Sequence, residues 1–286
     1  MRDRDADKGT PAGPVRPILI RALRGRSGTN HLADLLARHP DVALCEVAED
    51  MLSFQAGKLV EYADGLFGVL SEIGRAQDLP PARRSADALT AGLGEALAAY
   101  LGAPAVPRPL FKSPAFQDER AALRLMPTAS LVVLLRDPRS IAESAVRAHW
   151  GQGRTPVAVG ADWAKAARRL DRFLSDSADL TRAGRVHLVR FEALAERPRK
   201  TLAALLGQLD LAATAEVLDY AEAAPVIGSS YLPRDPSGLT DFRPQPRPEG
   251  FDPRTRWAHW GPKEHKAFNR VCGVMMERFG YKMARF

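Results

Sequence analysis

A glycine-containing loop near the start of the chain has the residue types needed to hold a phosphate. The loop Arg24-Gly25-Arg26-Ser27-Gly28-Thr29 follows the apolar run Ile18-Leu19-Ile20. Leucines then recur at helical spacing between His31 and Arg38. Glycines allow a tight turn, and the free N–H groups at the start of a helix attract anions. The pattern predicts a strand, an anion-binding loop and a helix, with Thr29 able to cap the helix or bind the anion.

The loop lacks the signature of an ATP-binding loop. That signature places a lysine and then a serine or threonine directly after its last glycine. Here Thr29 and Asn30 follow Gly28, and the cation of the loop is Arg26. An ordinary strand-to-helix turn is the alternative interpretation of this segment taken alone.

A second segment places an arginine where another strand is expected to end. The apolar run Leu131–Leu135 is followed by Arg136-Asp137-Pro138-Arg139, and Ser144 lies further along the expected helix. Parallel strands present their carboxyl ends at one edge of the sheet, where ligands bind. There Arg136 could bind a phosphate through two charge-assisted hydrogen bonds, and Ser144 could add a hydroxyl. The alternative is that Arg136 pairs with a carboxylate and Ser144 only packs.

Together the two segments resemble the 5′- and 3′-phosphate-binding elements of sulfotransferases, which use 3′-phosphoadenosine 5′-phosphosulfate (PAPS). The resemblance runs in order from about Pro17 to Tyr281 and is to the bacterial, tyrosylprotein- and carbohydrate-type branch. It continues through His39-Pro40-Asp41-Val42 to Glu46, Phe111-Lys112-Ser113-Pro114, Val189 to Leu194, Arg256-Trp257 and Phe279-Gly280-Tyr281.

The sequence departs from the family pattern at three places. Phe191 stands where the family usually has tyrosine, which removes a phenolic hydroxyl. Asn30-His31 replaces the common Thr-Thr or Thr-Leu after the glycine loop. Ser113 stands near the position of the histidine base of the phenol-type enzymes.

The resemblance implies in-line transfer of a sulfuryl group from PAPS to an acceptor, most often a hydroxyl or an amine, with no metal. Arg26 and Lys112 would neutralise the charge of the transferring group. Glu46 would be the general base, with Glu49 as the alternative and His31 as a weaker candidate. The residues expected at the nucleotide are Gly25, Arg26, Ser27, Gly28, Thr29, Asn30, Arg136, Ser144, Phe191, Ser237 and Arg243.

The elements that must position these residues follow from the apolar pattern. Short apolar runs predict further strands at Pro109–Lys112 and Val186–Arg190, and helical spacing occurs between the runs. Alternating strands and helices predict an α/β fold with a three-layer, doubly wound parallel sheet, which the resemblance makes a P-loop NTPase-like sulfotransferase fold. The expected helices are Ser85–Leu101, Ser140–His149, Ala161–Leu180, Arg199–Leu209 and Lys263–Phe279.

Two segments carry no readable pattern. Val47 to Pro80 and Ala224 to Arg254 are expected to shape the acceptor site, and the second, rich in Pro, Gly, Ser and Arg, to close over the nucleotide. Ser229, Ser230 and Arg234 are further candidates there. The charged segment 1–16 predicts a flexible tail before a single domain spanning 17–286.

Composition sets broader limits on the class of protein. The 286 residues carry a net charge of +7, which favours anionic partners. Two competing interpretations are a basic nucleic-acid-binding protein and a P-loop kinase or NTPase. The aromatic content of only 7% argues against the first, so we expect no nucleic-acid partner, and the missing loop lysine argues against the second. Neither a transmembrane run nor a secretory signal is visible, so we expect a cytoplasmic protein. Cys45 and Cys272 read as reduced thiols, and the histidines and cysteines form no metal-binding motif.

Overall fold

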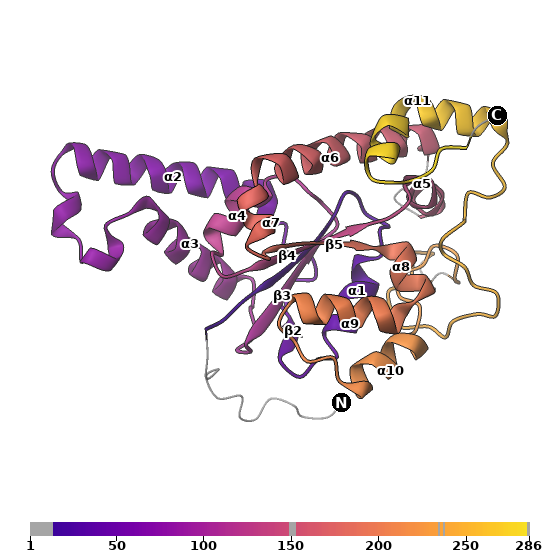
Figure 1. Cartoon of the computed structure of the whole chain (residues 1–286), viewed down its shortest axis with the longest axis horizontal. Helices are drawn as coiled ribbons and strands as arrows, with labels where there is room; N and C mark the ends of the chain where they lie inside the picture. Colours follow the sequence, from indigo (N-terminus) through magenta and orange to yellow (C-terminus); the bar gives the residue numbers. More distant parts are fainter. Residues whose placement is uncertain (1–13, 149–152, 234, 237, 285–286) are drawn as a thin grey trace.

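A parallel sheet of five strands lies at the centre of the computed structural model, which describes residues 14–148, 153–233, 235–236 and 238–284 (Figure 1). The strands are β1 (Ile18–Ala22), β2 (Val42–Leu44), β3 (Arg108–Ser113), β4 (Ser130–Leu135) and β5 (Val186–Arg190). Their order in the sheet is β2-β3-β1-β4-β5. The doubly wound parallel sheet predicted from the sequence is confirmed.

The strand order puts β1 at the point where the chain changes direction across the sheet. β1 pairs with β3 on one side and with β4 on the other, so that Ile20 lies opposite both Lys112 and Val132. Open α/β sheets bind ligands at such a switch point, outside the carboxyl ends of the strands. The residues that follow β1, β3 and β4 therefore come together at one edge.

Helices cover both faces of this sheet. They are α1 (Thr29–Leu36), α2 (Leu52–Glu72), α3 (Ala86–Tyr100), α4 (Glu119–Leu125), α5 (Pro138–Arg147), α6 (Pro156–Asp176), α7 (Ala178–Arg182), α8 (Phe191–Glu196), α9 (Pro198–Gln208), α10 (Ala215–Ala223) and α11 (Pro262–Arg278), with the short 3₁₀ helices η1 (Ala76–Asp78) and η2 (Pro81–Arg83).

Successive strand residues alternate between two hydrophobic cores. Leu19 and Phe111 face a core built with α2, α4, α5, α6 and α11, whereas Ile20 and Leu110 face a core built with α1, α8, α9 and α10. Side chains alternate across a strand, so each strand buries both of its faces. This explains why the strands read as continuous apolar runs and confirms the three layers.

Several elements differ from the expectations. The helix expected at Ala161–Leu180 is divided between α6 and α7, because the chain leaves helical geometry at Ser177. The sequence pattern did not reveal β2, α2, α4, α8 and α10. The long segment that follows α10 contains no helix or strand among its described residues, although an isolated antiparallel bridge pairs Val226 with Gln245.

Part of the segment with no readable pattern is the long helix α2, which pairs with α3 to form an arm that projects from the sheet (Figure 1). The buried face of α2 consists of Leu52, Ser53, Ala56, Val60 and Ala63. Small side chains dominate this face, so the usual signal of large apolar residues at helical spacing is weak. No helix in the described ranges combines the length and the apolar character that crossing a bilayer requires.

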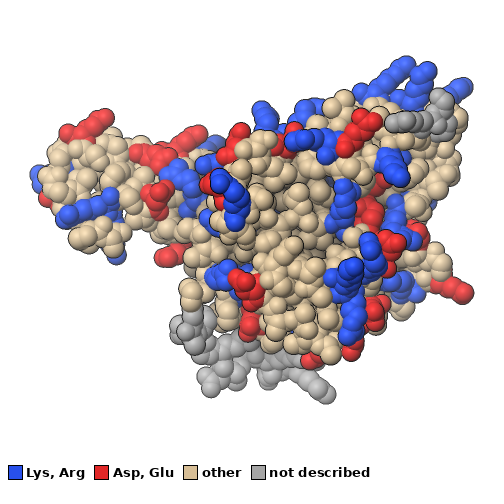
Figure 2. Space-filling view, viewed as in Figure 1, with Lys and Arg blue, Asp and Glu red and all other residues tan. Residues whose placement is uncertain are grey.

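The described chain is attached to the sheet from just before the first strand. The Arg16 N–H donates to the Pro107 carbonyl at 2.9 Å, one residue before the expected first residue, Pro17. Residues 1–13 of the expected tail lie outside the described residues, as does His149, the expected end of α5. Charged side chains of both signs are interspersed over the face seen in Figure 2, with no continuous basic stripe on that face.

The contact between α3 and α4 supplies a stability test. A Cβ added to Gly94 would lie 1.8 Å from the Leu125 carbonyl oxygen, so we expect Gly94→Ala to lower the free energy of unfolding by about 1–3 kcal/mol. Gly92 on the same helix has open space around it, and Gly92→Ala should raise stability by about 0.5–1 kcal/mol. Urea unfolding of both variants measures the difference, and equal stabilities would contradict the packing described here.

Candidate functional site

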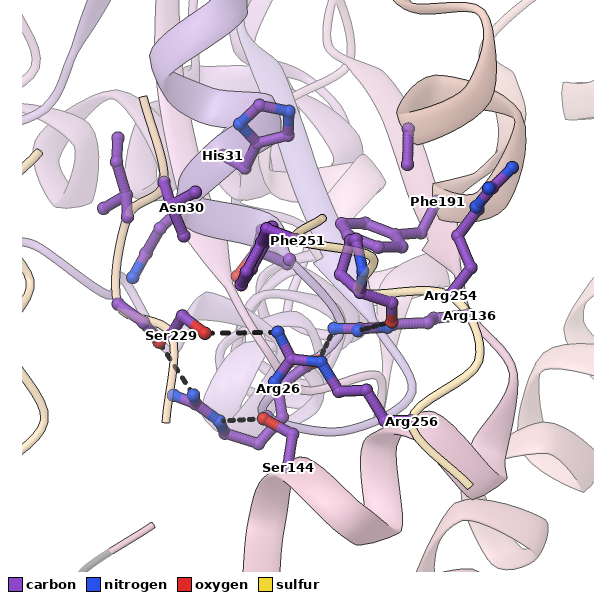
Figure 3. A pocket seen from close by; sticks show the side chains of 18 of the residues that line it. Arg26, Asn30, His31, Arg136, Ser144, Phe191, Ser229, Phe251, Arg254 and Arg256 are labelled. Carbon is purple, nitrogen blue, oxygen red and sulfur yellow. Dashed lines mark hydrogen bonds between the residues drawn. The ribbon is translucent and has the colours of Figure 1, made fainter. Parts of the chain in front are cut away.

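A cavity of about 880 Å³ opens at the sheet edge where β1 and β4 end (Figure 3). One wall is the loop between β1 and α1, and another comes from Arg136, Ser144 and Phe191. The irregular segment after α10 closes the remaining side with residues from two stretches, 225–229 and 242–256. The two sequence segments singled out for phosphate binding therefore meet in one cavity.

Backbone conformation fixes the shape of the glycine loop. Arg26 has φ 77° and Gly28 has φ 98°, both in the left-handed region. A Cβ on Gly28 would lie 2.6 Å from the Phe191 ring, so close approach as well as φ requires glycine there. Helix α1 begins at Thr29 with no side chain capping its first amides, which leaves them available to an anion.

Ser27 has a structural place in this loop. Its side chain is buried, and its hydroxyl donates to the Arg24 carbonyl at 2.7 Å. The cavity lining instead includes Gly25, Arg26, Gly28, Thr29 and Asn30, the other loop positions predicted from the sequence.

Arg26 links the loop to the far walls of the cavity. Its Nε donates to Ser144 Oγ at 3.0 Å, and its Nη2 donates to the Gly228 carbonyl at 2.7 Å. Burial, and secondly the nearby Arg256, lower the pKa of Arg26 to about 10. Its guanidinium is therefore held in a setting where an additional negative charge would be stabilised.

Arg136 lies deeper, at the end of β4. It is buried, and its two Nη groups donate to the carbonyls of Arg26 at 2.7 Å and Pro253 at 2.5 Å. Leu135 and Arg190 are paired in the sheet register, so the residues that follow them, Arg136 and Phe191, lie side by side. The guanidinium carbon is 4.1 Å from the Phe191 ring centroid. This contact is one that a tyrosine at position 191 would also make.

Electrostatics at Arg136 also favour an anion. Burial lowers its pKa to about 10, and the nearby Glu192 opposes this effect. Arg136 Nε is buried with no hydrogen-bond partner among the described residues. A buried donor without a partner is costly, and a ligand oxygen could satisfy it.

The third arginine of this cluster comes from the irregular segment near the C-terminus. Arg256 donates from Nη2 to Ser229 Oγ at 3.2 Å, and its guanidinium carbon is 3.7 Å from the Tyr231 ring centroid. Burial, and next the charge of Arg136, lower the pKa of Arg256 to about 9. Arg26, Arg136 and Arg256 converge on the cavity in Figure 3, and we call them the arginine cluster.

A carboxylate of the cavity lining is paired with a lysine that lies outside the lining. Glu49 lines the cavity beside Pro114, and Lys112 Nζ is 3.3 Å from Glu49 Oε1. Lys112 is nearly buried, with a side-chain exposure of 9%, whereas that of Glu49 is 38%. The pair brings together a cation for charge neutralisation and a carboxylate that solvent or substrate can reach.

Glu46 lies apart from the cavity lining. Its N–H donates to the Gly102 carbonyl at 3.0 Å, and its side chain packs where a Cβ of Gly102 would lie. Of the two carboxylates weighed as the base, the structure brings Glu49 to the cavity.

Of the two nucleotide-binding residues proposed from the long segment, the structure describes Arg243 and does not bring it to this cavity. Arg243 is 75% exposed and pairs with Asp241 at 2.7 Å. Ser237 lies outside the described residues, as does Arg234. Ser230 instead supports the cavity wall, with its Oγ 3.0 Å from Ser144 Oγ.

Sequence reasoning did not single out several residues of the lining. They are Gly228, Phe242, Arg247, Phe251 and Arg254. The segment that carries them contains many arginines without periodicity, and nothing in the sequence separates Arg247 and Arg254 from Arg243. Among the arginines near the end of this segment, only Arg256 belonged to a motif of the family resemblance, Arg256-Trp257.

Comparisons with known proteins agree with this geometry. The family profile described as "Sulfotransferase family" matches residues 17–215. The sulfotransferase domain of the Synechococcus PCC 7002 olefin synthase is 20% identical with a TM-score of 0.56, over 96% of this chain and 99% of that domain. The sulfotransferase domain from the curacin biosynthetic pathway is 18% identical with a TM-score of 0.55, over 95% and 100%. The structural likeness shows the fold, and no curated protein sequence matches the chain.

His31, which also lines the cavity, supplies a pH prediction. Burial, and secondly Arg247, lower the pKa of His31 from 6.5 to about 4. As the pH falls below 6.5, His31 is protonated in the unfolded chain but stays neutral in the folded chain until the pH approaches 4. Protonation therefore favours the unfolded chain, by up to about 2 kcal/mol at pH 5.

We expect the loss of unfolding free energy between pH 7.5 and pH 5 to be smaller in His31→Gln than in the unaltered chain. Urea unfolding at the two pH values measures both losses. An identical loss in the two proteins would mean that His31 is protonated as readily in the folded chain as in the unfolded one.

Proposed function

Because the chain belongs to the sulfotransferase family, we propose that it moves a sulfuryl group from PAPS to a hydroxyl-bearing acceptor. The observation that carries this proposal is the convergence of Arg26, Arg136 and Arg256 on the cavity, where they donate hydrogen bonds to backbone carbonyls and serine hydroxyls. A ligand with two separate phosphate groups suits such a site.

We assign the two ends of the nucleotide to different elements. The glycine loop and the first amides of α1 would hold the 5′-phosphosulfate. Arg136 and Ser144 would bind the 3′-phosphate, helped by the charge of Arg256. A 3′-phosphate is what distinguishes PAPS from ATP, so these side chains would select the donor.

The transfer step needs charge stabilisation more than covalent catalysis. The acceptor oxygen forms a new bond to sulfur while the bond from sulfur to the bridging phosphate oxygen breaks. The electron pair of that bond stays with adenosine 3′,5′-bisphosphate, and the acceptor proton passes to a base. Arg26 and Lys112 would neutralise the charge that grows on the leaving phosphate and on the moving group.

Glu49 is the base that we propose, in place of Glu46. Its carboxylate lies in the cavity wall beside Lys112, where an acceptor hydroxyl can approach both groups. A carbohydrate, a lipid, a tyrosine and a small metabolite each carry such a hydroxyl, and these are the acceptor classes that we propose.

Nucleotide binding is the first test. Adenosine 3′,5′-bisphosphate at about a hundred times its Kd should stabilise the chain by about 2.7 kcal/mol, a rise in Tm of about 5 °C.

Arg136→Ala should weaken binding of this bisphosphate by about tenfold or more, and should weaken binding of adenosine 5′-phosphate less. Arg75→Ala, which removes an exposed arginine from the arm, is the charge-matched control. A Tm rise with magnesium ATP alone would support the kinase alternative instead.

Turnover tests the base. The chain is incubated with PAPS and a panel of phenols, primary alcohols and saccharides, and released adenosine 3′,5′-bisphosphate is measured. We expect Glu49→Gln to lower kcat by about 100-fold or more and Glu46→Gln to leave it within about threefold. The opposite pattern would assign the base to Glu46. Equal activity in both variants would leave neither carboxylate as the base.

A further inference from the structure

A buried ion network lies directly behind the Glu49–Lys112 pair. Arg21, on β1, donates from Nη2 to Asp50 Oδ1 at 2.8 Å and from Nη1 to Asp50 Oδ2 at 3.0 Å. Its Nε lies 3.3 Å from Glu119 Oε2 on α4, and all three side chains have no exposed surface. Such a two-pronged contact between a guanidinium and a carboxylate fixes orientation as well as distance.

Asp50 is the residue after Glu49, and further contacts attach it to the same strand. The Asp50 N–H donates to the Lys112 carbonyl at 3.1 Å, while Lys112 Nζ meets the Glu49 carboxylate. Asp50 Oδ1 also accepts the Leu52 N–H at 2.8 Å, at the start of α2. The Glu49-Asp50 dipeptide is therefore held from β1 through Arg21 and from β3 through Lys112.

The backbone next to this dipeptide is in an uncommon conformation. Met51 has φ 50°, in the left-handed region that non-glycine residues rarely adopt. Such a conformation persists where the surroundings impose it. The hydrogen bonds of Asp50 on either side of Met51 supply that constraint.

Buried ion pairs contribute little to stability in comparison with apolar residues of the same size, because the charges lose their hydration. What they do supply is a defined geometry. We propose that Arg21 and Asp50 are positioning residues that hold the Glu49 carboxylate against Lys112 for sulfuryl transfer. This role rests on the proposed function, because it concerns the base of that reaction.

Glu119 provides a control within the same network. It contacts Arg21 and, on α2, Ser53, whereas the hydrogen bonds of the Glu49-Asp50 dipeptide described above go to Arg21, Lys112 and Leu52. Burial raises the pKa of Glu119, which favours its neutral form. Glu119→Gln should therefore preserve the position of Asp50.

The experiment compares Arg21→Lys with Glu119→Gln in the full chain. Arg21→Lys keeps the charge but loses the two-pronged contact with Asp50. We expect amide hydrogen exchange of Asp50 and Leu52 to accelerate by about tenfold in Arg21→Lys. We expect kcat to fall by about 10- to 100-fold, using the best acceptor of the panel.

Nucleotide binding and fold stability separate positioning from general damage. The Kd for adenosine 3′,5′-bisphosphate should stay within about twofold in both variants, because Arg21 makes no described contact with the arginine cluster. Glu119→Gln should keep the kcat and the Asp50 and Leu52 exchange rates of the unaltered chain. The triple variant Arg21→Met/Asp50→Asn/Glu119→Gln, which leaves no unpaired charge, should fold and should show the same loss of kcat.

Three results would overturn the proposal. Full kcat in Arg21→Lys despite faster local exchange would show that Glu49 needs no such support. Unchanged local exchange would show that Arg21 does not hold the dipeptide. Equal losses of kcat in Arg21→Lys and Glu119→Gln would indicate a general effect on the fold. Failure of the proposed function itself is visible earlier, because the unaltered chain would then release no bisphosphate from PAPS with any acceptor.

Discussion

Repulsion between arginines is the constraint on which the cavity depends. Arg26, Arg136 and Arg256 are drawn together although each lowers the pKa of another. The hydrogen bonds described above go to backbone carbonyls and serine hydroxyls, which hold the guanidinium groups without cancelling their charge. A carboxylate in the same places would neutralise the site. The positive potential is thus kept for a ligand, and anion binding relieves the repulsion.

The topology of the sheet turns this cluster into a directional site. β1 lies between β3 and β4, so Lys112, the glycine loop and Arg136 arrive at one edge from three adjacent strands. The arginines gather on the β4 side, whereas Glu49 and Lys112 lie on the β3 side. In the proposed reaction the acceptor hydroxyl would therefore approach the sulfur from the side opposite the leaving phosphate, as in-line displacement requires.

Local chemistry explains how much of this could be predicted from the sequence. Strong apolar runs precede both the Gly25–Thr29 loop and Arg136, and Ser144 lies in a helix with a clear start. The fold and one half of the cavity could therefore be predicted. The sequence pattern did not predict the arm formed by α2 and α3, because α2 buries mainly small residues. Choosing between Glu46 and Glu49 required knowing how the chain turns after β2, and Met51, with its positive φ, carries no sequence signal of that turn.

The irregular segment was the hardest part to interpret, and its hydrogen bonds show the reason. Gly228 and Pro253 hold the arginine cluster through their carbonyl oxygens, and the Arg254 carbonyl accepts the Ser140 hydroxyl at 2.6 Å. Every amino acid has a carbonyl, so the hydrogen bonds themselves place little demand on residue type, although the φ of 63° and the nearby Phe242 ring favour glycine at position 228. Evolution is thus free to replace much of this segment while the cavity keeps its shape. Sequence identity between homologues will therefore underestimate their relatedness in this segment. The path of the backbone is the better basis for comparing them there.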